Sequence, residues 1–196
     1  MSQHYYLVAS LPTISYESKD AMSPEDFLEL CRQQLSDDEY RAVAAASIDA
    51  PAAGALPDGA PVLTRWLEHE RGLRNALVKL RAPGRGADAE AYMRRDEGGN
   101  DGTSADSITE LAREAHASET PLGAETALNQ ARWRFLEDLE TGHFFDLDRV
   151  ALYYVKLQII ARRLLFDRKQ GEERYNAVSE RIMQEYYQES DREQSE

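Results

Sequence analysis

The histidines and carboxylates of this sequence do not follow the spacing of a metal site. No two of its four histidines, His4, His69, His116 and His143, lie four residues apart. Glu140 and His143 form one E-x-x-H half-motif, whereas a carboxylate di-iron bundle needs two copies and further glutamates. Gly142 also interrupts the helix that would have to position this pair. The sequence therefore predicts no metal site, and we expect His143 at a helix end.

Phosphate-binding loops and activated nucleophiles are also missing from the sequence. Gly84-Arg85-Gly86 lacks a third glycine and follows no strand pattern, and no G-x-x-x-x-G-K-[ST] or G-x-S-x-G motif occurs. The single cysteine, Cys31, shares a helical face with Phe27 and Leu35, which is typical of a buried structural thiol. We therefore expect a chain without catalysis or a bound cofactor. The alternative is an enzyme whose carboxylate or arginine site is assembled across several helices.

One stretch of the chain is basic. It contains seven cationic residues against two acidic ones, Asp88 and Glu90, in a chain with a net charge of -13. These cations could pair with the protein's own acids, dock an acidic partner, or bind nucleic acid. Nucleic acid is the poorest fit, because Tyr92 is the only aromatic residue among them. The cationic residues are Arg71, Arg74, Lys79, Arg81, Arg85, Arg94 and Arg95.

Three tyrosine pairs form a second feature. They are Tyr5-Tyr6, Tyr153-Tyr154 and Tyr186-Tyr187. Neighbouring residues of a helix point about 100° apart, so one tyrosine of a pair can face the core and the other a second surface. That second surface is either the boundary of the core or a partner interface, since tyrosine supplies contact area at low entropic cost.

Composition narrows the class of protein. The 196 residues are 42% hydrophobic and 30% charged, which provides a core for one domain, or for one with a small lobe. The strongly acidic balance disfavours phosphate backbones and anionic lipid as partners. One cysteine fits a reducing compartment. The start of the chain lacks the pattern of a signal peptide, and no apolar run reaches the roughly 20 residues of a membrane-spanning helix.

Helix signals dominate the chain and predict an all-α bundle of about six to eight helices. Ser23-Pro24 and the capping box of Ser36 with Glu39 each predict a helix start. Residues 5–11 fit either a strand or a short helix. We expect an N-terminal helical segment over 1–49, a Pro- and Gly-rich hinge over 50–61, a main bundle over 62–189 and a disordered tail over 190–196. The alternative is a single domain overall.

Within the main bundle, apolar spacing predicts a helix over about 62–81, weakened by about 1 kcal/mol at Gly72. A short helix is expected between the breaks of 83–103, another over 107–117, and one from Thr120-Pro121 that ends at Gly142. Asp146 is expected to cap the core helix, which Gly171 ends. A last amphipathic helix is predicted over 175–186.

Three stretches of the sequence resemble a known but uncharacterised bacterial family. They are the opening YYLVASLP, the central RGLRNALVKLRA (71–82) and the later ALYYVKLQIIARRLLFDRKQGEERY. Members of that family have about this length and are commonly encoded among subunits of V-type (archaeal-type) rotary ATPases. The last stretch is also distantly similar to the C (or d) subunit of those machines, an all-helical funnel. That subunit is much longer and has three helical lobes, of which this chain could supply one.

The resemblance implies a mechanical or assembly role in ion or proton transport. We expect a non-catalytic accessory or central-stalk-type subunit that links the rotor to the ion-translocating ring. It would be cytoplasmic, peripheral to the inner membrane through its complex, and would bind neither nucleic acid nor lipid. A free-standing helical adaptor or regulator is the alternative. The residues expected to contact partners are Tyr5, Tyr6, Arg74, Arg81, Arg85, Arg94 and Arg95.

Overall fold

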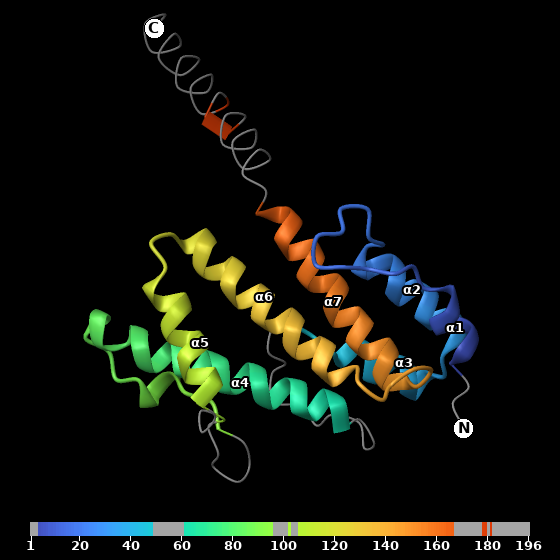
Figure 1. The fold of residues 1–196 in the computed structure, drawn as a ribbon, viewed down its shortest axis with the longest axis horizontal. Coiled ribbons are helices and arrows are strands. Elements are labelled where there is room, and N and C mark those ends of the chain that lie inside the picture. Colours follow the sequence, from blue (N-terminus) through green and yellow to red (C-terminus); the bar gives the residue numbers. More distant parts are fainter. Residues whose placement is uncertain are drawn as a thin grey trace, which may run out of the picture. The chain divides into compact units, whose positions relative to one another are not determined.

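A computed structural model describes residues 4–48, 61–95, 102, 106–166, 178–179 and 181. These residues form seven α-helices and no strands, which confirms the predicted all-α bundle (Figure 1). Short 3₁₀ turns at Pro83–Arg85 and Glu90–Tyr92 follow α4. The helices are α1 (Tyr5–Ser10), α2 (Pro24–Gln34), α3 (Asp37–Ala45), α4 (Pro61–Arg81), α5 (Asp106–Ala117), α6 (Pro121–Leu139) and α7 (Leu147–Leu165).

Polar caps set the starts of several helices where the sequence predicts them. The Ser23 hydroxyl accepts a hydrogen bond from the backbone N–H of Asp26, and the Thr120 hydroxyl accepts one from Gly123. Ser36 and Glu39 form the full capping box. Each cap satisfies N–H groups that have no partner inside their own helix, and is worth about 1 kcal/mol.

Helix α7 is the central element of the core, as predicted. Nine of its residues are buried, among them Val150, Tyr153 and Ile160. On one side Tyr153 packs against Phe27 of α2, with ring centroids 5.3 Å apart, and donates a hydrogen bond to the carbonyl of Pro12. On another side the Lys156 ammonium lies over the ring of Trp133 on α6. α7 therefore joins the N-terminal helices to the rest of the bundle.

Cys31 of α2 is fully buried, in agreement with its interpretation as a structural thiol. Burial raises the pKa of this thiol to about 12, so it stays protonated at neutral pH. A protonated, inaccessible thiol is a poor nucleophile.

The chain that follows α3 is tied to the bundle by three side chains. Trp66 donates from its indole N–H to the carbonyl of Ser47. Gln158 of α7 accepts from the N–H of Ile48 and donates to the carbonyl of Ala46. Arg74 donates to the carbonyl of Ile48. These contacts fix residues 46–48 against α4 and α7 without any regular secondary structure.

Helices α4, α5 and α6 share a second apolar cluster. α5 packs against both α4 and α6, which lie to either side of it in Figure 1. The cluster contains Leu73, Ala76 and Leu77 of α4, Ile108, Ala112 and Ala115 of α5, and Leu128 of α6.

Gly72 lies in the middle of α4 because another segment approaches its backbone closely. A Cβ at this position would lie 2.2 Å from the carbonyl oxygen of Gly102 and 3.1 Å from Ile108 Cδ1. Gly102 itself has a φ of 73°, which favours glycine. The close approach explains a residue that costs helix stability and is otherwise unfavourable here.

We expect Gly72→Ala to destabilise the fold by about 1–3 kcal/mol, because the added methyl group overlaps backbone atoms that cannot rotate away. Urea unfolding followed by circular dichroism measures the change. Gly84→Ala is the matched control, since nothing lies within 4 Å of a Cβ at that position. Gain of stability in Gly72→Ala, as helix propensity alone would give, would contradict the packing described here.

Other expectations differ from the structure in detail. α1 is a helix, which settles the ambiguity of residues 5–11. α6 ends at Leu139, three residues before the predicted stop, and a turn with Gly142 at a φ of 91° leads to α7. The predicted helix between 83 and 103 is instead represented by 3₁₀ turns in the residues described.

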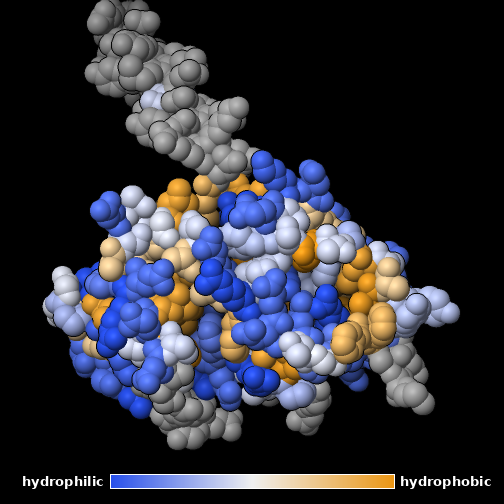
Figure 2. Space-filling model, viewed as in Figure 1, coloured by the Kyte–Doolittle hydropathy of each residue, from blue (hydrophilic) through white to orange (hydrophobic). Residues whose placement is uncertain are grey.

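Compact units were predicted at 1–49 and 62–189, whereas contacts group residues 1–161 and 162–196 into two units. α7 ends at Leu165, six residues before the stop predicted at Gly171, and a turn at Phe166 follows it. Most of the expected hinge, the tail and nearly all of the last amphipathic helix lie outside the described residues, so these boundaries stay predictions. None of the described helices combines the length and apolar character needed to cross a bilayer. On the face drawn in Figure 2, hydrophilic residues surround smaller hydrophobic patches.

Candidate functional site

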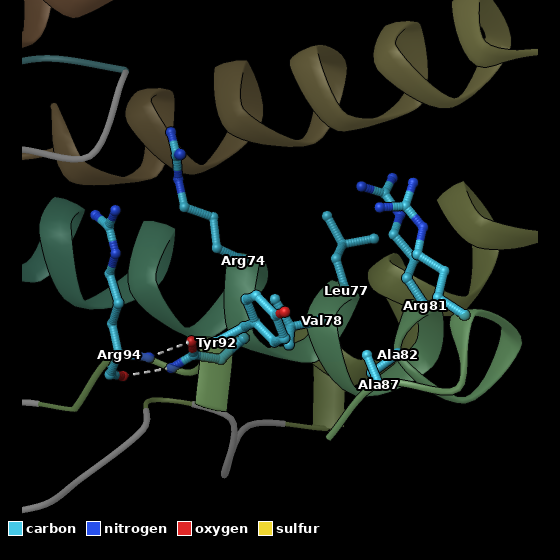
Figure 3. Close-up of a pocket in the computed structure, with 10 residues that line it drawn as sticks. Arg74, Leu77, Val78, Arg81, Ala82, Ala87, Tyr92 and Arg94 are labelled. Atoms are coloured by element: carbon cyan, nitrogen blue, oxygen red, sulfur yellow. Dashed lines mark hydrogen bonds between the residues drawn. The ribbon is translucent and has the colours of Figure 1, made fainter. Parts of the chain in front are cut away.

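Four of the five arginines expected to contact partners surround one cavity of about 520 Å³ at the end of α4 (Figure 3). We call it the arginine pocket. Arg74 and Arg81 come from α4, Arg85 from the first 3₁₀ turn, and Arg94 from the chain after the second. None of the described residues that line it is acidic. The lining residues are Arg74, Asn75, Leu77, Val78, Arg81, Ala82, Arg85, Ala87, Tyr92 and Arg94.

The walls of the arginine pocket are built by a chain reversal after α4. Gly86 adopts a left-handed φ of 62°, and its N–H bonds to the carbonyl of Pro83. The N–H of Ala87 then bonds to the carbonyl of Ala82. The reversal brings residues 87–94 back beside α4, where a long uninterrupted helix could not place them.

Asn75 fixes the returning chain. Its side-chain oxygen accepts from the N–H of Arg94 at 2.9 Å, and its amide donates to the carbonyl of Arg94 at 2.6 Å. Asn75 is buried, so this two-way clamp satisfies polar groups that would otherwise be unpaired. The clamp holds the backbone of Arg94 while its side chain remains exposed (Figure 3).

The arginines of this region differ in their ion pairs. Arg74 contacts Glu70 at 3.6 Å, and Arg95, which does not line the pocket, pairs with Glu90 at 2.6 Å. In contrast, the guanidinium groups of Arg81, Arg85 and Arg94 make no ion pair with any carboxylate that the structure describes. The basic stretch is therefore only partly neutralised by the protein's own acids. Three exposed cations converge on a pocket in an acidic chain.

A buried ion pair between Glu70 and Arg132 contacts Arg74, one of the residues that line the pocket. Glu70 is 0% exposed and Arg132 of α6 is 7% exposed. Arg132 donates from Nε and from the terminal nitrogen to the two Glu70 oxygens, at 2.7 and 3.1 Å, and also donates to Asn129. Glu70 thus links Arg132 with Arg74, so a core carboxylate helps to orient one arginine of the pocket.

His69 lies beside this ion pair and stacks on Phe135, with ring centroids 3.9 Å apart. Burial, opposed by the Glu70 charge, lowers the pKa of His69 below its ordinary value. The unfolded chain therefore binds this proton more tightly than the folded chain does. The contribution of neutral His69 to stability is present above pH about 6.5 and is lost as the pH falls through the lower folded-state pKa.

We therefore expect the free energy of unfolding to decrease on acidification below pH about 6.5, and to decrease less in His69→Phe, which keeps the stacked ring without the titrating group. Urea unfolding at a series of pH values measures both chains. An identical pH dependence in the two chains would show that His69 does not contribute.

The predicted aromatic contacts lie on a separate surface. Tyr5 and Tyr6 are 54% and 83% exposed, so both face outward rather than one toward the core. Tyr5 packs against Phe145 at 4.7 Å, and Phe144 beside it is 71% exposed. In the second pair Tyr153 is buried and Tyr154 is half-buried, as expected, whereas Tyr186-Tyr187 lies outside the described residues.

The E-x-x-H pair does not assemble. Glu140 instead contacts Lys156 at 2.8 Å and Arg149 at 2.5 Å. Among the described residues, His143, Asp146 and Asp148 bring donor atoms within 4.8 Å of one another, the spacing a metal ion would need. However, His143 Nδ1 hydrogen-bonds to Asp146 at 2.7 Å, and Asp146 also accepts from the N–H of Arg149 at the start of α7. The bond from Arg149 caps α7, and His143 lies between the carboxylates of Asp146 and Asp148, at 2.7 and 3.6 Å.

Six lining residues were not predicted at the site, because little in the sequence indicates them. They are Asn75, Leu77, Val78, Ala82, Ala87 and Tyr92. The α4 residues fall at helical spacing between Arg74 and Arg81, but such spacing equally describes a core face. Only the chain reversal at Gly86 distinguishes a pocket wall from a core face, because it brings Ala87 and the following residues beside α4.

A family model described as "Protein of unknown function (DUF2764)" matches residues 101–186, which include α5, α6 and α7. The match covers less than half of the chain and does not include the arginine pocket. Neither the curated proteins nor the solved structures yield a match to this chain.

Proposed function

We propose that this chain is a non-catalytic docking subunit that binds an acidic protein partner at the arginine pocket. The observation that carries the proposal is the set of three exposed arginines that pair with no carboxylate of the described residues, gathered around a cavity in a chain of net charge -13. Unpaired cations raise the local potential and favour a complementary anionic surface. Arginine also carries much of the binding energy in many protein interfaces.

A protein partner fits better than nucleic acid. Polyphosphate backbones are repelled by the acidic chain as a whole, and the described lining of the pocket offers one aromatic ring for stacking, that of Tyr92. An acidic polypeptide brings fewer charges and can contact the apolar lining as well. The exposed Tyr5 and Tyr6 supply a second aromatic surface of the kind found in protein interfaces.

We place this docking role in a bacterial V-type ATPase, as an accessory or central-stalk-type subunit between the rotor and the ion-translocating membrane ring. The support is the resemblance of the three sequence stretches to the family encoded with such ATPases. ATP hydrolysis would then belong to other subunits. The chain would contribute only binding energy and mechanical linkage, and would meet the membrane through its complex.

The test is co-purification from native membranes under conditions that keep the ATPase intact. A tagged chain should recover the ATPase catalytic subunits, and the charge reversal Arg81→Glu/Arg85→Glu should reduce that recovery. Arg65→Glu is the control, because Arg65 is exposed on the same helix but does not line the pocket. Recovery of no ATPase subunits would remove the ATPase assignment. A soluble acidic partner lost in the same reversal would identify a free-standing adaptor.

A further inference from the structure

The arrangement of charges in the arginine pocket limits the shape of its occupant. Arg74 is paired with Glu70 and donates to the Ile48 carbonyl, so the two ends of the pocket are better represented by Arg94 and Arg81. The backbone of Arg94 is clamped to Asn75, which lies six residues before Arg81 on α4, so the two arginines start from points of α4 about 9 Å apart. In Figure 3 Arg94 lies at one end of the lining and Arg81 at the other, with Tyr92 and Leu77 between them, and the Arg74 side chain points away from Tyr92. The pocket therefore has two basic ends and an apolar middle.

An occupant that contacts both ends must carry two anionic groups about two turns apart. A single phosphate or carboxylate lies against one end and leaves the other unpaired. An acidic α-helix has this spacing at positions i and i+7, because it shares the rise of α4. Residues i+3 and i+4 of such a helix lie on the same face between the two acids.

The middle of the pocket suits those intervening residues. Leu77 and Ala82 are buried, Val78 and Ala87 are half-buried, and Tyr92 is an exposed ring above them. Apolar side chains at i+3 and i+4 would cover this surface and exclude water from the neighbouring ion pairs, which strengthens them. A nucleic acid backbone has no apolar group at that place.

We infer that the arginine pocket binds an amphipathic acidic helix of the partner, with carboxylates about two turns apart on Arg94 and Arg81 and apolar side chains over Leu77 and Tyr92. This inference rests on the proposed function, because it describes the partner at the same site. Arg85 flanks the helix and favours an acidic residue beside it.

Calorimetric titration of the full chain with synthetic peptides tests the inference. The probe is a helical peptide of about 20 residues, long enough to fold, with glutamates at i and i+7 and leucines at i+3 and i+4. A second peptide has the same composition with one glutamate moved to the opposite face, and a third has glutamine at both positions. Inorganic pyrophosphate and duplex DNA complete the set of ligands.

The first peptide should bind about tenfold or more tightly than the second and third, and Arg81→Gln should weaken it about tenfold or more, whereas Arg65→Gln should not. Thermal unfolding checks that Arg81→Gln remains folded. Equal binding of the rearranged peptide, tighter binding of pyrophosphate or DNA, or no effect of Arg81→Gln would overturn the inference.

The two proposals fail in different ways. If ATPase subunits co-purify but the peptides do not discriminate, the helix inference alone is wrong. If the acidic peptide binds in an Arg81-dependent manner but native membranes yield no ATPase subunits, the ATPase assignment is wrong and the acidic partner belongs to another complex.

Discussion

Replacing Arg132 with leucine is expected to lower the free energy of unfolding by about 3–5 kcal/mol, because it leaves a buried carboxylate without its main partner. Glu70 is 0% exposed, and two hydrogen bonds from Arg132 satisfy its oxygens. The half-buried Arg74 lies 3.6 Å away and compensates only in part. Urea unfolding at neutral pH measures the loss.

The double variant Glu70→Leu/Arg132→Leu separates the penalty of an unpaired charge from the loss of packing. With both charges removed, most of the lost stability should return, since apolar replacement of a buried pair is often close to neutral. If the double variant is as unstable as the sum of its two single variants, the pair contributes mainly through shape, and the electrostatic account is wrong.

The second large effect is expected at Trp66, where alanine should cost about 3–5 kcal/mol. Trp66 is 0% exposed on α4, and its ring lies near those of His69 and Phe135. Its indole N–H also bonds to the carbonyl of Ser47. Alanine removes both the buried ring and the hydrogen bond that holds the segment after α3. Denaturant unfolding measures the total.

Trp66→Phe retains an aromatic ring but removes the N–H donor, so the Ser47 carbonyl loses one partner. We expect a smaller loss than in Trp66→Ala, and about 1 kcal/mol of that smaller loss reflects the missing hydrogen bond to Ser47. Equal losses in the two variants would show that the hydrogen bond to Ser47, rather than the volume of the ring, dominates this contact.

Local signals made much of the fold predictable. Ser23, Ser36 and Thr120 cap their helices because a side-chain oxygen satisfies N–H groups within three residues, a relation visible in sequence. The apolar residues of α7 recur every three to four residues in the sequence. In a helix this spacing places them on one face, so the pattern predicts which residues of α7 are buried.

Long-range contacts were not predictable in this way. Glu70 and Arg132 are 62 residues apart, and in a chain with 36 acidic residues nothing in the sequence pairs them. From the sequence, Gly72 only lowers the stability of α4. The close approach of the Gly102 backbone, which explains the glycine, is visible only in the structure. The end of α6 depends on the turn that contains Gly142, and the helix stops three residues before this glycine.

The candidate site was predictable in part. The excess of cations between Arg71 and Arg95 indicates a basic surface. The sequence alone does not show that Arg74 and Arg95 form ion pairs, whereas Arg81 and Arg85 form none with the described carboxylates. That difference depends on the Gly86 reversal and the Asn75 clamp, which place residues 87–94 beside α4.

The central claim, that the arginine pocket recognises carboxylates, is tested most directly by exchanging charges across the contact. Calorimetry would compare the chain and its Arg81→Glu variant against the acidic helical peptide and against one with lysine in place of the glutamate opposite Arg81. The account predicts that the original chain prefers the glutamate peptide and that Arg81→Glu prefers the lysine peptide. If both chains bind both peptides with equal affinity, the pocket does not distinguish the charge of the peptide residue opposite position 81, and the account is contradicted.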